Sequence, residues 1–189
     1  MKKLLFALLL ATAAAATSSR AATYKVDPAH SFLLFKISHF GAGYVWGRFD
    51  DLGGKITLDP SNTSKDSVNF TVKSASVDTA NPKRDEHLKS PDFFNVKQFP
   101  EITFVSSKVE KTGDNTFSVT GNLTLRGVTK PLTVTVKELG TGKGMMGETR
   151  TGFETTFTIK RSDYGMNFMV GPAGDEVSLT LDAEGVKQL

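Results

Sequence analysis

Apolar and polar residues alternate with a period of two along most of the chain between Ser31 and Gly185. Successive side chains of a strand point to opposite faces, so this period indicates strands with one buried and one exposed face. The run from Phe117 to Arg126 shows it most clearly, with Phe, Val, Gly and Leu on one face and Ser, Thr, Asn and Arg on the other. The pattern therefore predicts an all-β protein.

The length of the alternating runs bears on the architecture. Several runs extend to nine or ten residues, whereas the usual strand has about five or six. Long antiparallel strands joined by short turns suit either an up-and-down barrel or a sandwich, and strand length favours the barrel. We expect an antiparallel, eight-stranded barrel, whose interior is wide enough to hold one small ligand.

One segment breaks the alternation and predicts a short helical insert. Asn81 is a good N-cap and Pro82 a good first helical residue, and Leu88 supplies an apolar contact. A second start signal follows and carries Phe93 and Phe94 on one turn. Two adjacent aromatic rings need a large apolar surface, so we expect this insert to pack on the mouth of the barrel.

The N-terminus has the features of an export signal. Residues 1–21 contain two early lysines, an apolar stretch over 4–16 and small residues before a cleavage site after Ala21 or Ala22. The apolar stretch is too short for a membrane-spanning helix, so we expect no stable membrane insertion. The prediction is a cleaved Sec-type signal peptide, a single domain over 22–189, and a soluble periplasmic product.

Charge and cysteine content narrow the classes of function. The chain has 23 basic and 20 acidic residues, and Lys2, Lys3 and Arg20 account for the excess, so the exported chain is formally neutral. Neutrality speaks against nucleic acid or an acidic membrane surface as partners. There is no cysteine, which excludes disulfides, so stability has to come from an apolar core.

Titratable side chains give no clear catalytic or metal-binding pattern. His30, His39 and His87 lack the close spacing of metal ligands, so we expect no metal. His39 stands at the end of an apolar row, where it suits either a core-edge position or contact with a ligand head group. Arg84 and Arg161 leave the same choice open, whereas structural roles are favoured for His87, Asp85 and Asp163.

Several sequence blocks in a fixed order carry a family resemblance. They are Asp27–Ser31, Gly47–Phe49, Arg84–Phe94, Phe99–Phe104, Gly121–Pro131 and Arg161–Gly165. In these blocks the chain resembles the YceI-like family of bacterial exported proteins. The resemblance implies an extended, lipocalin-like β-barrel whose pore takes a polyisoprenoid or another long-chain amphiphile such as an isoprenoid quinone or a fatty acyl chain. It implies no catalytic residue and no cofactor besides the bound lipid.

Residue pattern alone favours a filled core, because protein interiors are normally close-packed. The resemblance favours a hollow one, and a mixture is expected, with one end of the barrel closed by side chains. The positions expected to contact ligand are Leu33, Phe35, Ile37, His39, Trp46, Phe70, Val72, Leu88, Phe93, Phe94, Phe104, Phe117, Val119, Leu123, Phe153, Phe157, Ile159, Val177 and Leu179.

Two other classes of function stay open on the sequence. One is a lipid-modifying enzyme that uses His39 or His87 with a nearby carboxylate. The other is a protein-docking module with a solid barrel, in which Phe93, Phe94 and the methionine-containing loops form the patch. The leading hypothesis is a non-catalytic carrier of a long-chain amphiphile. A homodimer is compatible with the sequence, which identifies neither the ligand nor the oligomeric state.

Overall fold

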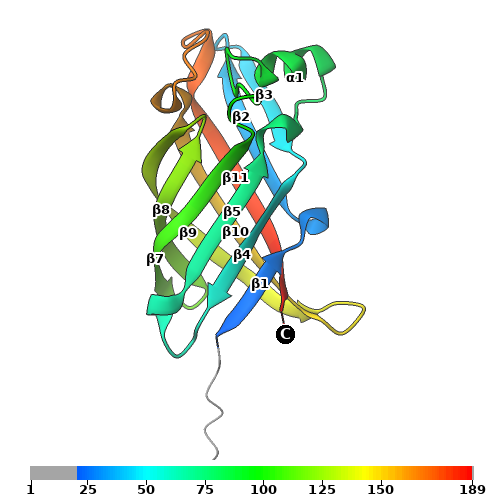
Figure 1. Cartoon of the computed structure of the whole chain (residues 1–189), viewed down its shortest axis with the longest axis vertical. Coiled ribbons are helices and arrows are strands. Elements are labelled where there is room, and N and C mark those ends of the chain that lie inside the picture. The colour runs from blue at the N-terminus through cyan, green and yellow to red at the C-terminus, as the bar shows by residue number, and fades with distance from the viewer. Residues whose placement is uncertain (1–20, 189) are drawn as a thin grey trace, which may run out of the picture.

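The computed structural model describes residues 21–188. Apart from Ala21, the expected signal peptide lies outside this range. The described chain forms one elongated antiparallel barrel, with the single α-helix at one end and both chain ends at the other (Figure 1). The predicted eight-stranded barrel with a short helical insert is confirmed.

Between residues 21 and 188 all elements belong to this barrel or to its connections. The strands are β1 (Ala22–Val26), β2 (Phe32–His39), β3 (Gly43–Phe49), β4 (Leu52–Leu58), β5 (Ser67–Lys73), β6 (Val77–Asp78), β7 (Glu101–Gly113), β8 (Thr116–Leu125), β9 (Val128–Lys143), β10 (Thr149–Lys160) and β11 (Ala173–Lys187). The helix α1 spans Pro82–Lys89, and 3₁₀ turns cover Pro28–His30, Thr63–Lys65, Ser74–Ser76 and Arg161–Tyr164.

Eleven strand segments make eight barrel positions because three long strands are interrupted. The ring runs β1-β4-β5-β7-β8-β9-β10-β11 and closes where β11 pairs with β1. Further along β11 the partner becomes β2, which pairs with β3, and β3 pairs with β6. Thus β1 and β2 share one position, as do β4 with β3 and β5 with β6.

The first interruption follows from its sequence. Asp27 precedes Pro28, which cannot donate a ladder hydrogen bond, and the carboxylate of Asp27 instead accepts a hydrogen bond from Ala29 N at 3.0 Å. The chain makes one 3₁₀ turn and rejoins β11 further along. The wall therefore continues upward as β2, β3 and β6.

A short two-residue turn fixes the register of one long hairpin. Arg126 and Gly127 join β8 to β9 with φ of 51° and 73°, the positive values that two-residue hairpin turns of type I′ require. The guanidinium of Arg126 donates to the carbonyls of Gly165 and, at 2.7 Å, Pro91. These bonds hold a non-glycine residue in its strained conformation and tie the turn to both loops of the upper end.

The helix begins as its sequence predicts. Asn81 Oδ1 accepts from Arg84 N at 3.1 Å, and Pro82 occupies the first turn. Leu88 and Phe94 pack against the core, where Phe94 meets Phe49 edge-on with ring centroids 5.4 Å apart. The insert therefore lies against one side of the upper end of the barrel (Figure 1). No helix in residues 21–188 is long and apolar enough to cross a membrane.

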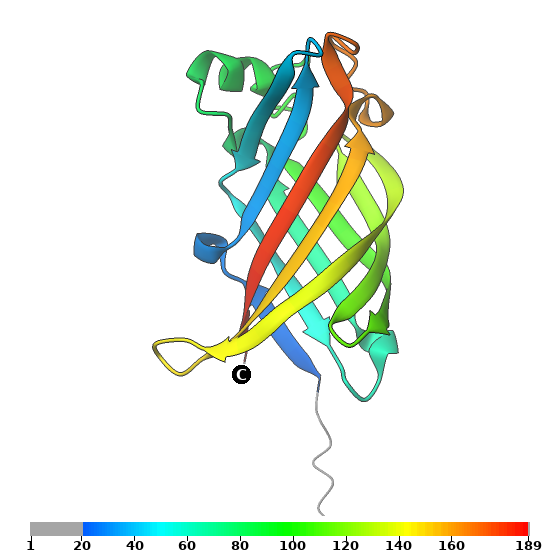
Figure 2. The same cartoon turned by 180° about the vertical axis from the view of Figure 1, so that it is seen from behind.

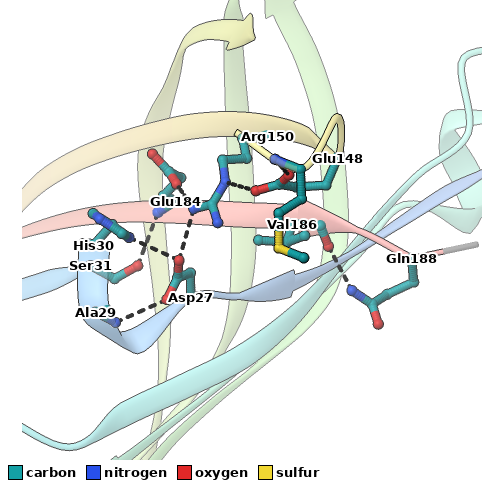
Figure 3. A network of polar contacts seen from close by, with 10 residues as sticks. Asp27, Ala29, His30, Ser31, Glu148, Arg150, Glu184, Val186 and Gln188 are labelled. Atoms are coloured by element: carbon teal, nitrogen blue, oxygen red, sulfur yellow. Dashed lines mark hydrogen bonds and ion pairs between the residues drawn. The ribbon is translucent and has the colours of Figure 1, made fainter. Parts of the chain in front are cut away.

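Polar contacts hold the lower end together around Arg150 (Figure 3). Its guanidinium donates to Asp27 Oδ2 at 2.8 Å, to Glu148 Oε1 at 2.7 Å and to Glu184 Oε1. These partners come from the β1–β2 junction, the β9–β10 hairpin and β11. The barrel closes where these elements meet, so the ion pairs of Arg150 stabilise the closed barrel.

The hydrogen-bonded ladder between β9 and β10 is incomplete. It runs from Thr149↔Lys143 to Glu154↔Lys137 with a bulge at Gly152/Phe153, and then ends. Above that point the two strands run apart (Figure 2), and Thr155 Oγ1 donates across to Thr135 O at 2.8 Å. The upper parts of both strands keep their other neighbours, β8 and β11.

Candidate functional site

The upper part of the barrel encloses a cavity of ≈ 330 Å³. Its wall is formed by the inward-facing rows of the strands, by α1 and by the loop after the turn Arg161–Tyr164. The lining residues His39, His87 and Phe168 are exposed to solvent, and all belong to the end of the barrel that carries α1. This end is therefore the mouth of the cavity.

Most positions expected from the sequence line this cavity. They are Leu33, Phe35, Ile37, His39, Phe70, Val72, Leu88, Phe93, Phe94, Phe104, Val119, Leu123, Phe157, Ile159, Val177 and Leu179. All but His39 are apolar, and they come from both halves of the chain. The alternative of a protein-docking module assumed a solid barrel, and this cavity removes that premise.

Phe117 and Phe153 lie below the main cavity. They line a second, apolar space of ≈ 60 Å³, which shares Val68, Phe70 and Val119 with the main cavity above it. Both rings are buried, and Phe153 meets Tyr24 edge-on at 6.4 Å between centroids. These two rings fill much of the lower end, as the expectation of a partly filled barrel requires.

Trp46 is a correction to the expected site, because it lies on the outer face and is 60% exposed. In the β2–β3 ladder Phe35 pairs with Gly47 and Lys36 with Trp46. Lys36 is on the outward face, so its partner is also outward, and Lys36 Nζ lies 5.4 Å from the centre of the Trp46 ring. The polar character of Lys36 is the sequence signal for this outward position.

Other lining residues were not identified from the sequence. Leu181 continues the expected row of Val177 and Leu179 on β11, and Val134 and Val136 share one face of β9, from which no position was expected. Strand parity could have found all three. Met166, Phe168 and Met169 belong to an irregular loop. No periodicity places loop side chains, so these three require the structure.

Three aromatic rings meet at the mouth. The centre of the His87 ring lies 5.0 Å from that of Phe93 and 5.2 Å from that of Phe168. The Phe93 and Phe168 ring centres are 5.5 Å apart, and all three pairs are edge-on. His87 Nε2 also lies 2.9 Å from Asp92 Oδ2. The contacts join the helical insert to the 165–174 loop across the opening.

Arg161 holds that loop in place. Its Nη1 donates to the carbonyls of Met166 and Phe168, both at 2.8 Å. Its Nε and Nη2 donate to Gly174 O at 2.8 Å and Ala173 O at 2.9 Å. The residue is 3% exposed, and this burial lowers the pKa of its guanidinium. It also lines the cavity.

Arg84 lines the mouth from the first turn of α1. Its Nε donates to Thr79 Oγ1 at 2.7 Å and its Nη2 to Thr79 O at 2.8 Å. The carboxylate of Asp85 accepts from the backbone N and the hydroxyl of the same threonine. Thr79 thus fixes the orientation of α1 and of the arginine.

Asp27, His30 and Glu184 place three possible metal-ligand atoms within 4.8 Å of one another. The Arg150 guanidinium donates to two of these groups, Asp27 and Glu184 (Figure 3). The positively charged side chain of Arg150 therefore already pairs with both carboxylates. The arrangement is therefore a structural ion-pair network.

Comparisons with known proteins give a consistent result. A family model described as the YceI-like domain matches residues 24–185. A UPF0312 protein of Pseudomonas paraeruginosa is 45% identical over 191 residues, with 100% of both chains covered.

Solved structures share the fold. BcnA of Burkholderia cenocepacia matches with a TM-score of 0.76 and 26% identity, over 84% of this chain and 98% of that one. A polyisoprenoid binding domain from Saccharophagus degradans matches with a TM-score of 0.67 and 19% identity, over 87% of this chain and 98% of that one.

Proposed function

Since the chain belongs to the YceI-like family, we propose that it is a soluble, periplasmic, non-catalytic carrier of a long-chain amphiphile. The tail of a polyisoprenoid, an isoprenoid quinone or a fatty acyl chain would occupy the cavity. The polar end would remain at the mouth. The expected export signal supports the periplasmic location.

The observation that carries this proposal is the composition of the cavity wall. Apart from residues at the mouth, only Thr103 and Thr155 contribute polar side chains. The hydroxyl of Thr155 is already bonded to Thr135 O. A wall with so few polar groups selects an apolar guest and gives little discrimination among tails.

The energetics suit such a guest. Each buried methylene contributes about 0.8 kcal/mol, so a tail of about ten methylenes supplies roughly 8 kcal/mol, which corresponds to micromolar affinity before the cost of ordering the tail. The lower space of ≈ 60 Å³ adjoins the main cavity. It gives a longer tail further room, so specificity would be set by cavity width more than by hydrogen bonds.

The proposal is tested by solvent extraction of the purified protein followed by mass spectrometry. We expect a long-chain lipid in wild type and a several-fold lower amount in Val45→Trp. Val45 lines the cavity, and an indole there would occupy the space of the tail. Reproducible absence of lipid from wild-type protein, or full occupancy in Val45→Trp, would contradict the carrier.

A matched control is available on the same strand. Tyr44 precedes Val45, faces outward and is 62% exposed. Tyr44→Trp introduces the same side chain outside the barrel, and we expect it to carry as much lipid as wild type.

A further inference from the structure

The mouth of the cavity holds positive charge that no carboxylate in the cavity wall balances. Two arginines, Arg84 and Arg161, line the cavity, whereas no aspartate or glutamate of the described chain does so. Neither guanidinium has a carboxylate oxygen within 4.0 Å among residues 21–188, since the ion pairs there involve other groups.

Arg161 is the more buried of the two charges. The four carbonyl groups that it contacts reduce its positive potential but carry no net charge. The nearby carboxylate of Asp175 instead accepts from Ser162 N at 2.9 Å and Ser162 Oγ at 2.8 Å. A charge in low-dielectric surroundings acts more strongly on a neighbouring ion than a charge in water.

Arg84 has hydrogen-bonding capacity to spare. A guanidinium has five N–H donors, and the contacts of Arg84 with Thr79 use Nε and Nη2. Within the described chain Nη1 makes no hydrogen bond to protein, and the side chain is half-buried. Asp85 lies on the other side of Thr79, with its carboxylate bonded to that residue.

Contacts connect the two arginines around the opening. Arg84 and His87 are three residues apart on α1 and share a helix face. The ring of His87 meets Phe93, and the Arg161 guanidinium lies 6.0 Å from the centre of the Phe93 ring. Asp92 also lies beside this path, and its carboxylate contacts His87 Nε2.

From this arrangement we propose that the mouth is an anion site for the head group of the carried amphiphile, a phosphate or a carboxylate. Arg84 donates hydrogen bonds to the head group, and Arg161 supplies a fixed positive charge behind it. The inference rests on the proposed function, because the tail in the cavity delivers the head group to the mouth. It adds a chemical class: the preferred guest is an acidic amphiphile.

The test compares two probes with the same tail. Binding of farnesyl phosphate and of farnesol to delipidated full-length mature protein is measured by calorimetry. We expect farnesyl phosphate to bind at least about tenfold more tightly than farnesol, with the difference shrinking as salt increases. Equal affinities in wild type would overturn the anion site and leave the carrier intact, whereas failure to bind either probe would count against the carrier itself.

Variants of α1 locate the effect. Arg84→Gln should lower the ratio of farnesyl phosphate affinity to farnesol affinity about tenfold, and this ratio corrects for any change of the cavity wall that affects both probes. Lys83→Gln removes the same charge from a neighbouring exposed residue outside the cavity wall and should change neither affinity. An Arg84→Gln variant that binds farnesol normally and keeps its full preference for farnesyl phosphate would exclude the assigned role of Arg84.

Free phosphate is a separate arm of the experiment. Because the tail provides most of the affinity, millimolar inorganic phosphate at constant ionic strength should leave farnesyl phosphate bound. Displacement of the probe by inorganic phosphate would overturn the amphiphile assignment in favour of a site for a free anion.

Discussion

At the scale of single residues, Asp27 shows how one side chain stabilises a junction. It caps the turn between β1 and β2 and accepts hydrogen bonds from Arg150 Nη1 at 2.8 Å and Ala29 N at 3.0 Å. The His30 ring nitrogen lies 2.9 Å away. The contacts with His30 and then Arg150 lower the pKa of Asp27 to about 2. The folded protein therefore favours the charged carboxylate.

This pKa shift predicts an acid-dependent loss of stability. A carboxyl group whose pKa is lower in the folded state stabilises the fold above its unfolded pKa, near 3.8, and loses that contribution as the pH falls to about 2. We expect Asp27→Asn to reduce the free energy of unfolding by about 1–2 kcal/mol at pH 7, with the difference from wild type shrinking below pH 4 and vanishing only below about pH 2.

Urea unfolding of both proteins across this range measures the difference. Asp114→Asn, in the exposed turn between β7 and β8, is the control and should show little effect at any pH. A constant difference between Asp27→Asn and wild type from pH 7 to pH 2 would argue against the charge of Asp27 as the cause.

At the scale of elements, the β2–β3 hairpin depends on a glycine beneath an aromatic ring. Gly47 pairs with Phe35, whose side chain lies over it and lines the cavity. A Cβ added at Gly47 would lie 2.3 Å from Phe35 Cζ and 2.8 Å from Thr79 Cγ2. The ring therefore takes the space that a second side chain would need, which gives the hairpin its inward packing.

Gly47→Ala should accordingly destabilise the protein by about 1–3 kcal/mol, because Phe35 has to leave its position. Thermal unfolding with and without bound lipid is the measurement, and we also expect reduced lipid occupancy from the displaced ring. Gly43→Ala on the same strand is the control, since nothing lies within 4 Å of a Cβ there. Equal melting temperatures for the two variants would contradict this account of the hairpin.

At the scale of the whole molecule, periodic side chains could be placed from the sequence, whereas breaks in the periodicity could not. Alternation placed Phe35, Val119 and Leu179 correctly in the interior because a strand has only two faces. Trp46, which was also expected to contact ligand, instead points outward, next to a glycine that occupies the inward position. The aromatic contact of Phe168 with His87 joins segments far apart in the chain, and no local pattern encodes it.

The extent of the hollow was also beyond sequence reasoning. Phe117 and Phe104 have the same inward parity, yet Phe117 lies at the filled lower end while Phe104 lines the main cavity. Height along the barrel decides between core and cavity, and it depends on register and on the three strand interruptions. The alternation of apolar and polar residues reveals neither the register nor the interruptions.

The incomplete ladder between β9 and β10 has a consequence for amide hydrogen exchange. The carbonyl of Thr135 accepts from Thr155 on β10, so the backbone of Thr135 faces the gap between β9 and β10. Backbone N–H and C=O groups point to the same side at every second residue of a strand, so Thr133 and Pro131 face this gap too. Pro131 has no N–H to leave unpaired there. We expect the amides of Thr133 and Thr135 to exchange quickly with deuterium although they lie in mid-strand, while those of Val134 and Val136, which face β8, exchange slowly. Equal protection of these amides from exchange would mean that β9 and β10 are hydrogen-bonded along this stretch in solution. An alternating pattern would mean that the barrel has one side where two strands can separate without global unfolding.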